Sequence, residues 1–151
     1  KFLKACASSG ISGLIIPDLP PEEGLEMETI IQKQNLDLIY LLAPTSTQER
    51  IRLVAERSRG FIYLVSVTGV TGARQELPAD LEAFLTRVRM VAHQSLCVGF
   101  GVSTIDQARR VAQTADGVIV GSRLIQLMED EDNFVSTVSS FIKELRQVLD
   151  E

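Results

Sequence analysis

Apolar runs that alternate with helix-like segments along the whole chain constrain its fold more than any other feature. Five runs are largely apolar, without regular polar positions, as in strands that are covered on both faces. They span residues 13–17, 37–43, 61–67, 96–100 and 117–120. After them, apolar residues recur at helical spacing over residues 25–31, 51–55, 81–91, 105–112 and 134–149. This succession predicts an α/β protein with a parallel sheet.

Residues suited to helix capping support the helical segments. Ser46 with Glu49 fits a capping box, and Ser103 with Asp106 is a shorter-armed version of the same pattern. Asn133 stands where it could cap the last helix. We therefore expect helices to begin directly after these residues.

Composition narrows the class of protein. The chain has 151 residues, which suits one domain, and 45% hydrophobic residues, which suffice for a sizeable core. A net charge of −5 without a basic run argues against nucleic-acid binding. No apolar stretch approaches the roughly 20 residues of a membrane-spanning helix. Two cysteines, Cys6 and Cys97, and one histidine cannot make a convincing zinc site, so we expect two reduced thiols and a cytoplasmic protein.

Glycine turns close three of the apolar runs, at residues 69–72, 99–101 and 121–122. Ligands of parallel α/β proteins bind beyond the carboxyl ends of the strands, and glycine lets backbone N–H groups approach them closely. Residues 122–128 could form a short helix whose free N–H groups face a bound anion. Three such turns in succession predict a phosphate site held by the main chain. The alternative is that these glycines only permit tight turns.

Other residues at strand ends have two interpretations each. Asp18 could act as a base or orient a substrate, or it could cap the next helix. Tyr63 could line a pocket or fill the core. Ile15, Leu41 and Phe100 could form an apolar cradle or belong to the ordinary core. The sequence shows no convincing pair of catalytic carboxylates and no nucleophilic triad.

Two architectures fit this pattern of elements. One is an open doubly wound sheet, but neither the dinucleotide-binding fingerprint nor a Walker sequence is present. The other is part of a (β/α)8 barrel, which has eight strands and about 250 residues. The chain offers five strand candidates, so it would supply the second half of such a barrel.

Several segments resemble the tryptophan synthase α subunit family. Residues 63–72, Tyr-Leu-Val-Ser-Val-Thr-Gly-Val-Thr-Gly, resemble its strand-six and loop-six motif. Residues 99–103 resemble its strand-seven turn, and residues 118–122 resemble its strand-eight phosphate turn. Residues 16–20 and 42–45 fit the ends of its strands four and five. The resemblance implies a TIM (β/α)8 barrel of which the chain supplies about strands 4 to 8, as a single, incomplete domain over residues 1–151.

The family cleaves indole-3-glycerol phosphate to indole and glyceraldehyde 3-phosphate in tryptophan biosynthesis, a carbon–carbon lyase reaction. The resemblance places the substrate phosphate at residues of the glycine turns: Gly72, Phe100, Gly101, Gly121 and Ser122. It places the indole against Ile15, Leu41 and Tyr63, and assigns Thr71 to a loop that closes over the site. It implies no metal.

The chain differs from the family's pattern at the catalytic residues. The two proton-transferring carboxylates of the family lie in the first part of the barrel, so we expect no catalytic residue here and no activity from the chain alone. The expected partners are indole-3-glycerol phosphate and the β subunit, which carries the pyridoxal phosphate; this chain needs no cofactor. Alternatives are another phosphate-binding barrel isomerase or synthase, or a non-catalytic half-barrel that self-associates through its open edges.

Overall fold

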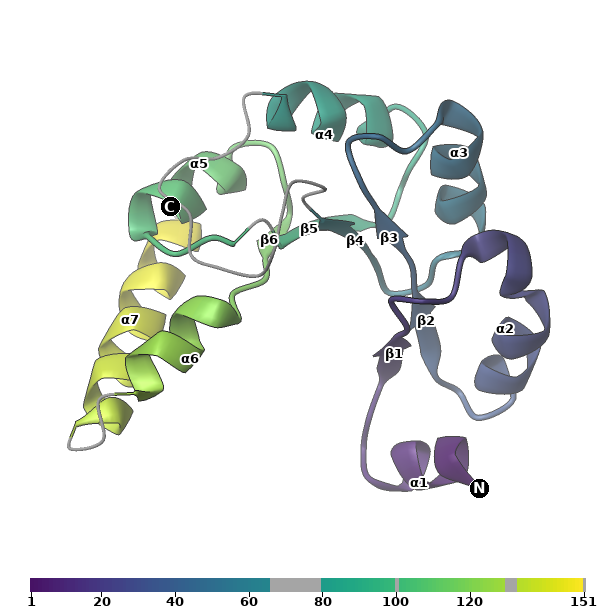
Figure 1. Cartoon of the computed structure of the whole chain (residues 1–151), viewed down its shortest axis with the longest axis horizontal. Helices are drawn as coiled ribbons and strands as arrows, with labels where there is room; N and C mark the ends of the chain where they lie inside the picture. Colours follow the sequence, from purple (N-terminus) through teal and green to yellow (C-terminus); the bar gives the residue numbers. More distant parts are fainter. Residues whose placement is uncertain (66–79, 100, 130–132, 151) are drawn as a thin grey trace.

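A computed structural model of the chain describes residues 1–65, 80–99, 101–129 and 133–150 (Figure 1). Helices and strands alternate through these ranges, as the sequence predicts. The strands are β1 (Gly13–Ile15), β2 (Asp37–Ile39), β3 (Leu41–Leu42), β4 (Phe61–Val65), β5 (Ser95–Gly99) and β6 (Gly117–Val118). The helices are α1 (Phe2–Ser8), the 3-10 helix η1 (Pro21–Glu23), α2 (Leu25–Gln32), α3 (Gln48–Arg57), α4 (Leu81–Arg89), α5 (Ile105–Ala112), α6 (Ser122–Met128) and α7 (Phe134–Leu149).

The described strands are all parallel and follow one another in sequence order. β1 pairs with β2, and β3 to β6 form a continuous ladder. Only Tyr40 separates β2 from β3, and its carbonyl accepts a hydrogen bond from the Tyr63 N–H at 3.1 Å. The two pieces therefore act as one strand, which gives five strand positions. A doubly wound sheet would reverse its strand order, so this order confirms the expected partial barrel.

The two faces of the sheet have different surroundings. Figure 1 shows helices α2 to α5 around the outside of the curved sheet. Side chains on that outer face belong to the buried core and include Leu38, Tyr40, Leu42, Ile62, Leu64, Leu96 and Val98. Alternate residues face the other way, and in β4 these are half-buried while Ile62 and Leu64 are fully buried. This inner face explains why the strand sequences are apolar at successive positions.

The first strand is shorter than the apolar run that predicts it. β1 ends at Ile15, because the Ile16 carbonyl accepts a hydrogen bond from the Leu19 N–H at 3.2 Å and closes a turn. Pro17 has no N–H to continue the ladder. The last strand likewise ends at Val118.

Two predicted caps are displaced by one residue. The hydroxyl of Thr47, not Ser46, caps α3 by accepting the Arg50 N–H at 3.3 Å. The Ser46 hydroxyl instead accepts the Ala43 N–H at 3.0 Å and closes the turn after β3. Each side chain therefore satisfies a different backbone donor, and the predicted pairing of Ser46 with Glu49 is wrong.

At α5, Thr104 and Gln107 form the capping box, in place of the predicted Ser103 and Asp106. The longer Gln107 side chain reaches back so that its Oε1 accepts the Ser103 and Thr104 N–H groups at 2.8 and 3.2 Å. Asn133 occupies the N-cap position of α7 as predicted, but its side chain makes no capping hydrogen bond.

Asp116 joins the amino ends of β5 and β6. Its Oδ2 accepts the Leu96 N–H at 2.7 Å and pairs with the Arg89 guanidinium from α4. Burial raises the pKa of this carboxyl, but the hydrogen bonds from Arg89 and Leu96 and the charge of Arg89 outweigh it. The pKa of Asp116 therefore lies below its ordinary value of 3.8.

The lowered pKa predicts an acid-sensitive contribution to stability. Asp116 stabilises the fold at pH values above its ordinary pKa, and this contribution disappears as pH falls through the lower, folded pKa. The Asp116→Asn variant should be less stable than the parent at pH 6, and the difference should shrink between pH 4 and pH 2. Urea unfolding across this range measures it. A difference independent of pH would show that the carboxylate charge does not contribute.

Both cysteines are free, with Cys6 buried and Cys97 half-buried. Among the described residues, no helix combines the length and apolar character needed to cross a membrane.

Candidate functional site

Two of the three glycine turns lie at neighbouring strand ends. Gly101 follows β5 and has a φ of +67°, a conformation that side-chain-bearing residues rarely adopt. Gly121 follows the last strand and is the N-cap of α6, which no side-chain hydrogen bond caps. Because β5 and β6 are parallel neighbours, both turns lie at the same, carboxyl end of the sheet. Ser122 is the first residue of α6 and is half-buried.

Three predicted site residues lie outside the described residues: Gly72, Thr71 and Phe100. Their assignment to phosphate binding and to loop closure stays a prediction. The described part of the predicted phosphate site therefore consists of Gly101, Gly121 and Ser122.

The residues predicted to contact indole share the inner face of the sheet. Leu41 and Tyr63 are register partners in β3 and β4. Ile15 pairs with Ile39, which lies two residues before Leu41 and so faces the same side. Ile15 is 43% exposed, whereas Leu41 and Tyr63 are half-buried. The structure thus brings all three to one apolar surface.

Tyr63 lies directly against the backbone of Gly99. A Cβ atom built on Gly99 would lie 2.5 Å from Cε2 and 2.6 Å from Cζ of the Tyr63 ring. Only glycine leaves room for this ring, so Gly99 allows the Tyr63 side chain to approach the backbone of β5 as well as allowing a turn. The ring consequently extends from β4 across β5, towards the edge that carries Gly101. Burial raises the pKa of the Tyr63 hydroxyl above its ordinary value.

Asp18 lies at the carboxyl ends of the strands, as predicted. It lines a cavity of about 200 Å³ together with Leu41 and Arg50. The alternative role as a helix cap is wrong, because Pro20 is the N-cap of η1 and Gly24 is the N-cap of α2. Its side chain is exposed and available to a ligand or a neighbouring loop.

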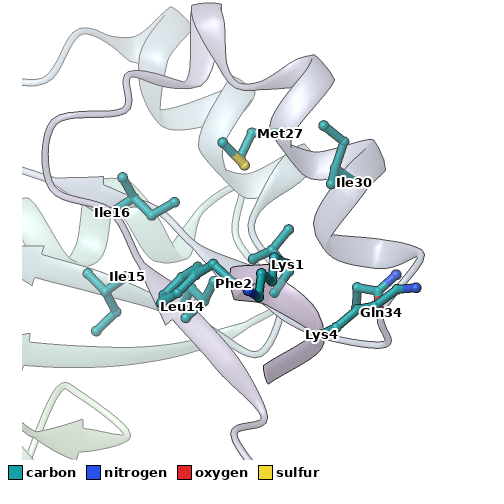
Figure 2. Close-up of a pocket in the computed structure, with 10 residues that line it drawn as sticks. Lys1, Phe2, Lys4, Leu14, Ile15, Ile16, Met27, Ile30 and Gln34 are labelled. Carbon is teal, nitrogen blue, oxygen red and sulfur yellow. The ribbon is translucent and has the colours of Figure 1, made fainter. Parts of the chain in front are cut away.

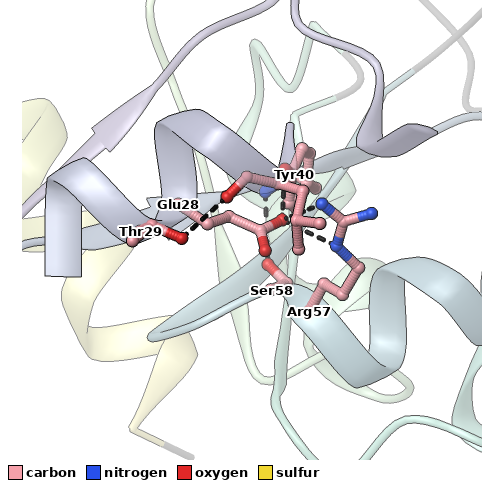
Figure 3. Close-up of polar contacts among 6 residues, drawn as sticks. Glu28, Thr29, Tyr40, Arg57 and Ser58 are labelled. Carbon is pink, nitrogen blue, oxygen red and sulfur yellow. Dashed lines mark hydrogen bonds and ion pairs between the residues drawn. The ribbon is translucent and has the colours of Figure 1, made fainter. Parts of the chain in front are cut away.

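A buried polar cluster on the outer side of the sheet was missed by sequence reasoning (Figure 3). The Tyr40 hydroxyl donates to Glu28 Oε1 at 2.5 Å, and Arg57 Nε donates to the same oxygen at 2.8 Å. Arg57 Nη2 lies 2.7 Å from this oxygen as an ion pair, without the geometry of a further hydrogen bond. Burial and the bond to Glu28 raise the pKa of Tyr40. The cluster connects α2, the strand formed by β2 and β3, and α3.

Ser58 extends this cluster to the start of β4. Its hydroxyl accepts the Tyr40 N–H at 3.2 Å and donates to the Phe61 carbonyl at 2.8 Å. The Tyr40 N–H cannot join the ladder at the break between β2 and β3, so Ser58 satisfies it. The cluster is structural, since it lies on the face opposite Tyr63 and Leu41.

A parallel sheet in sequence order, helices on its outer face and glycine turns at its carboxyl edge define part of a (β/α) barrel. Among the described residues, no group of His, Cys, Asp and Glu side chains could hold a metal ion. The sequence matches the family model described as "Tryptophan synthase alpha chain" over residues 1–150. The chain belongs to this family.

Individual relatives agree with the family. The tryptophan synthase alpha chain of Dehalococcoides mccartyi is 55% identical over 150 residues, which cover 99% of this chain and 58% of the relative. That of Gloeobacter violaceus is 51% identical over 128 residues, 84% of this chain and 46% of the relative. The chain thus spans about half the length of the curated relatives that it matches.

Solved structures agree on the fold. A Mycobacterium tuberculosis tryptophan synthase structure superposes with a TM-score of 0.88 at 38% identity, covering 98% of this chain and 55% of the other. The tryptophan synthase a2b2 complex of Pyrococcus furiosus gives a TM-score of 0.87 at 30% identity, covering 97% and 60%. The described elements are therefore arranged as in the corresponding part of longer chains.

Proposed function

We propose that the chain forms the substrate-binding part of a tryptophan synthase α barrel, a lyase that cleaves indole-3-glycerol phosphate in tryptophan biosynthesis. The observation that carries this proposal is that the Gly101 and Gly121 turns follow two adjacent parallel strands, at the carboxyl end of the sheet that bears the apolar inner face. Membership of the family selects this substrate over those of other phosphate-binding barrels.

The proposed phosphate site is built from backbone donors. Each hydrogen bond from an N–H group to a charged oxygen contributes about 1.5–3 kcal/mol, so a few of them hold a phosphate monoester without lysine or arginine. Gly121 suits this role because a Cβ built on it would meet no atom of the described residues within 4 Å. The space beside its backbone is therefore open to a ligand.

The indole would lie on the inner face. Leu41 and Ile15 offer aliphatic surface, and the Tyr63 ring offers an aromatic edge or face. The chain binds and orients the substrate in this proposal, while the acid and base that move protons come from the part of the barrel that this chain does not match. We therefore propose that the chain alone does not turn substrate over.

The proposed setting follows from the family. The chain would act in the cytoplasm with a tryptophan synthase β subunit, which carries the pyridoxal phosphate, and would need no cofactor of its own. The Pyrococcus furiosus a2b2 complex among the structural neighbours supports such a partner. In isolation the chain would self-associate, because its edge strands and inner face leave backbone and apolar groups uncovered.

Binding of indole-3-glycerol phosphate, measured by calorimetry, tests the proposal. We expect saturable binding that inorganic phosphate competes with, weaker binding of ribose 5-phosphate, and no release of indole. In the Gly121→Val variant the branched side chain would fill the open space beside the turn, so affinity should fall at least tenfold. Ser139→Ala, an exposed position on α7, is the matched control and should bind as the parent does.

Two results would contradict this proposal. One is equal affinity for the indole and ribose phosphates, which would place the chain with other phosphate-binding barrels. The other is unchanged binding in Gly121→Val with the parent's thermal stability, which would locate the phosphate elsewhere.

A further inference from the structure

A pocket of about 410 Å³ lies between helices α6 and α7, which pack against each other (Figure 1). Two side chains of α6, Arg123 and Leu127, line it on one side, and α7 supplies hydroxyl groups, an aromatic ring and a carboxylate on the other. This volume lies within the range of about 300–1,000 Å³ that is typical of small-molecule sites. None of the lining residues belongs to the phosphate or indole sites proposed above, so the pocket is a separate place for a ligand.

Helical spacing arranges the lining side chains in two rows. On α6, Arg123 and Leu127 lie four residues apart and share one face. On α7, Ser136, Ser140 and Glu144 recur every four residues and form one row. One helix therefore brings a cation to the pocket, and the other brings hydroxyl groups and an anion.

The two charged residues of the pocket do not neutralise each other. Arg123 is half-buried, and its Nε atom is buried without a hydrogen-bond partner. Neither Arg123 nor Glu144 forms an ion pair within the described part of the chain, although both line the same pocket. A buried N–H donor without an acceptor is costly, so the Arg123 Nε atom is suited to an oxygen atom of a ligand.

The chemistry of these groups selects a ligand that carries both charges. A guanidinium donates two parallel hydrogen bonds to one carboxylate, and the Thr137 hydroxyl can donate another. The Glu144 carboxylate attracts an ammonium group and repels a phosphate or another dianion. An amino acid carries a carboxylate and an ammonium group on neighbouring atoms and can satisfy both residues. Leu127 and Phe141, which are half-buried, offer apolar surface to its side chain.

A pocket beside β1 shows the contrast (Figure 2). It has a volume of about 550 Å³ and is lined mainly by apolar side chains of α1, β1 and α2, such as Phe2, Leu14 and Ile30. Its charged lining residues, Lys1 and Lys4, have the same sign, and no acidic residue is among the described residues that line it. An apolar ligand fits this pocket, but nothing there favours a ligand with both charges.

We propose that the pocket between α6 and α7 binds a free α-amino acid with an apolar side chain. The carboxylate of the ligand accepts hydrogen bonds from Arg123, and its ammonium group pairs with Glu144. Its side chain packs against Leu127 and Phe141.

Titration calorimetry of the chain with L-leucine and two analogues tests this proposal. The analogue 4-methylpentanoate lacks the ammonium group, and 3-methylbutylamine lacks the carboxylate. We expect saturable binding of L-leucine. Each analogue should bind at least about tenfold more weakly, because each loses one contact between charged groups.

Two substitutions separate the roles of the charged residues. Arg123→Gln should weaken the binding of L-leucine at least about tenfold, because an amide cannot replace the charged fork of arginine. Glu144→Gln should weaken L-leucine to a similar extent, but it should not weaken 4-methylpentanoate, which has no ammonium group. Glu144 is exposed, so circular dichroism should show that this variant folds as the parent does.

Arg146→Gln is the matched control for the loss of a positive charge. Arg146 lies on α7, its side chain is 72% exposed, and it does not line the pocket. Ile30→Asp is a second control, since it alters the apolar pocket beside β1. Both variants should bind L-leucine as the parent does.

Three results would overturn the proposal: no binding of L-leucine, equal affinities for L-leucine and 4-methylpentanoate, or a loss of binding in Ile30→Asp but not in Arg123→Gln. The three ligands contain neither phosphate nor indole. Their binding is therefore independent of the proposed lyase function, and the two proposals can fail separately.

Discussion

Replacing Arg57 by methionine should lower the free energy of unfolding by about 3–5 kcal/mol, because the variant leaves the Glu28 carboxylate buried without its cation. Glu28 is 8% exposed, and its Oε1 accepts hydrogen bonds from Arg57 Nε and from the Tyr40 hydroxyl. Equilibrium unfolding in urea at pH 7 measures the change. Methionine retains most of the aliphatic part of the arginine side chain, so the loss of stability measures mainly the loss of the Arg57 charge.

Arg50→Met is the matched control for this variant. Arg50 also lies on α3 and pairs with Glu22 at 3.0 Å, but the two side chains are 40% and 48% exposed. Water solvates both partners after the pair is broken, so the expected loss is below about 1 kcal/mol. Equal losses of unfolding free energy in the two variants would show that the burial of Glu28 does not determine the cost of removing its partner.

The Gly24→Ala variant should lose at least about 2 kcal/mol through the same cluster. Gly24 has a φ of −79°, which alanine adopts without strain. Its added methyl would, however, overlap the Tyr40 hydroxyl and lie 2.9 Å from Cζ of that ring. Tyr40 is 1% exposed, so its ring can make room for the methyl only by disturbing its packing and its hydrogen bond to Glu28.

A double-mutant cycle with Tyr40→Phe tests this cause. Phenylalanine lacks the hydroxyl that the methyl group of alanine at position 24 would overlap. Gly24→Ala should therefore lower the free energy of unfolding less in the Tyr40→Phe background than in the parent. Gly121→Ala is the control, because its added methyl meets no atom of the part of the chain that the structure describes within 4 Å and should change stability little. Additive losses from Gly24→Ala and Tyr40→Phe would mean that another contact is responsible.

The sheet was predictable because every strand run is apolar at successive positions. Ile62 and Leu64 are buried under the helices, while Phe61, Tyr63 and Val65 are half-buried on the inner face. Both sets are apolar, which is typical of a strand within a barrel. The sequence could not predict that Tyr40 divides the second strand position into β2 and β3, because an aromatic residue in an apolar run gives no sign of a break.

The polar cluster could not be predicted for a related reason. Glu28 and Arg57 lie on helices whose apolar periodicity defines a buried face, but periodicity does not tell which polar side chains turn towards the sheet. Their pairing also joins residues 29 positions apart. Nothing in the sequence marks Gly24 either, because the need for glycine at this position arises only from the nearby Tyr40 ring. The glycine turns at positions 101 and 121, in contrast, are recognisable because each directly follows an apolar run.

The division of each strand between two faces also bears on how the sequence can diverge. Substitutions at Ile62 or Leu64 alter packing against the helices, whereas those at Tyr63 or Val65 alter the inner face, where we propose that the substrate binds. On that proposal, selection for stability and selection for substrate choice would act on adjacent codons with little conflict. Lineages can exchange one set of residues while retaining the other.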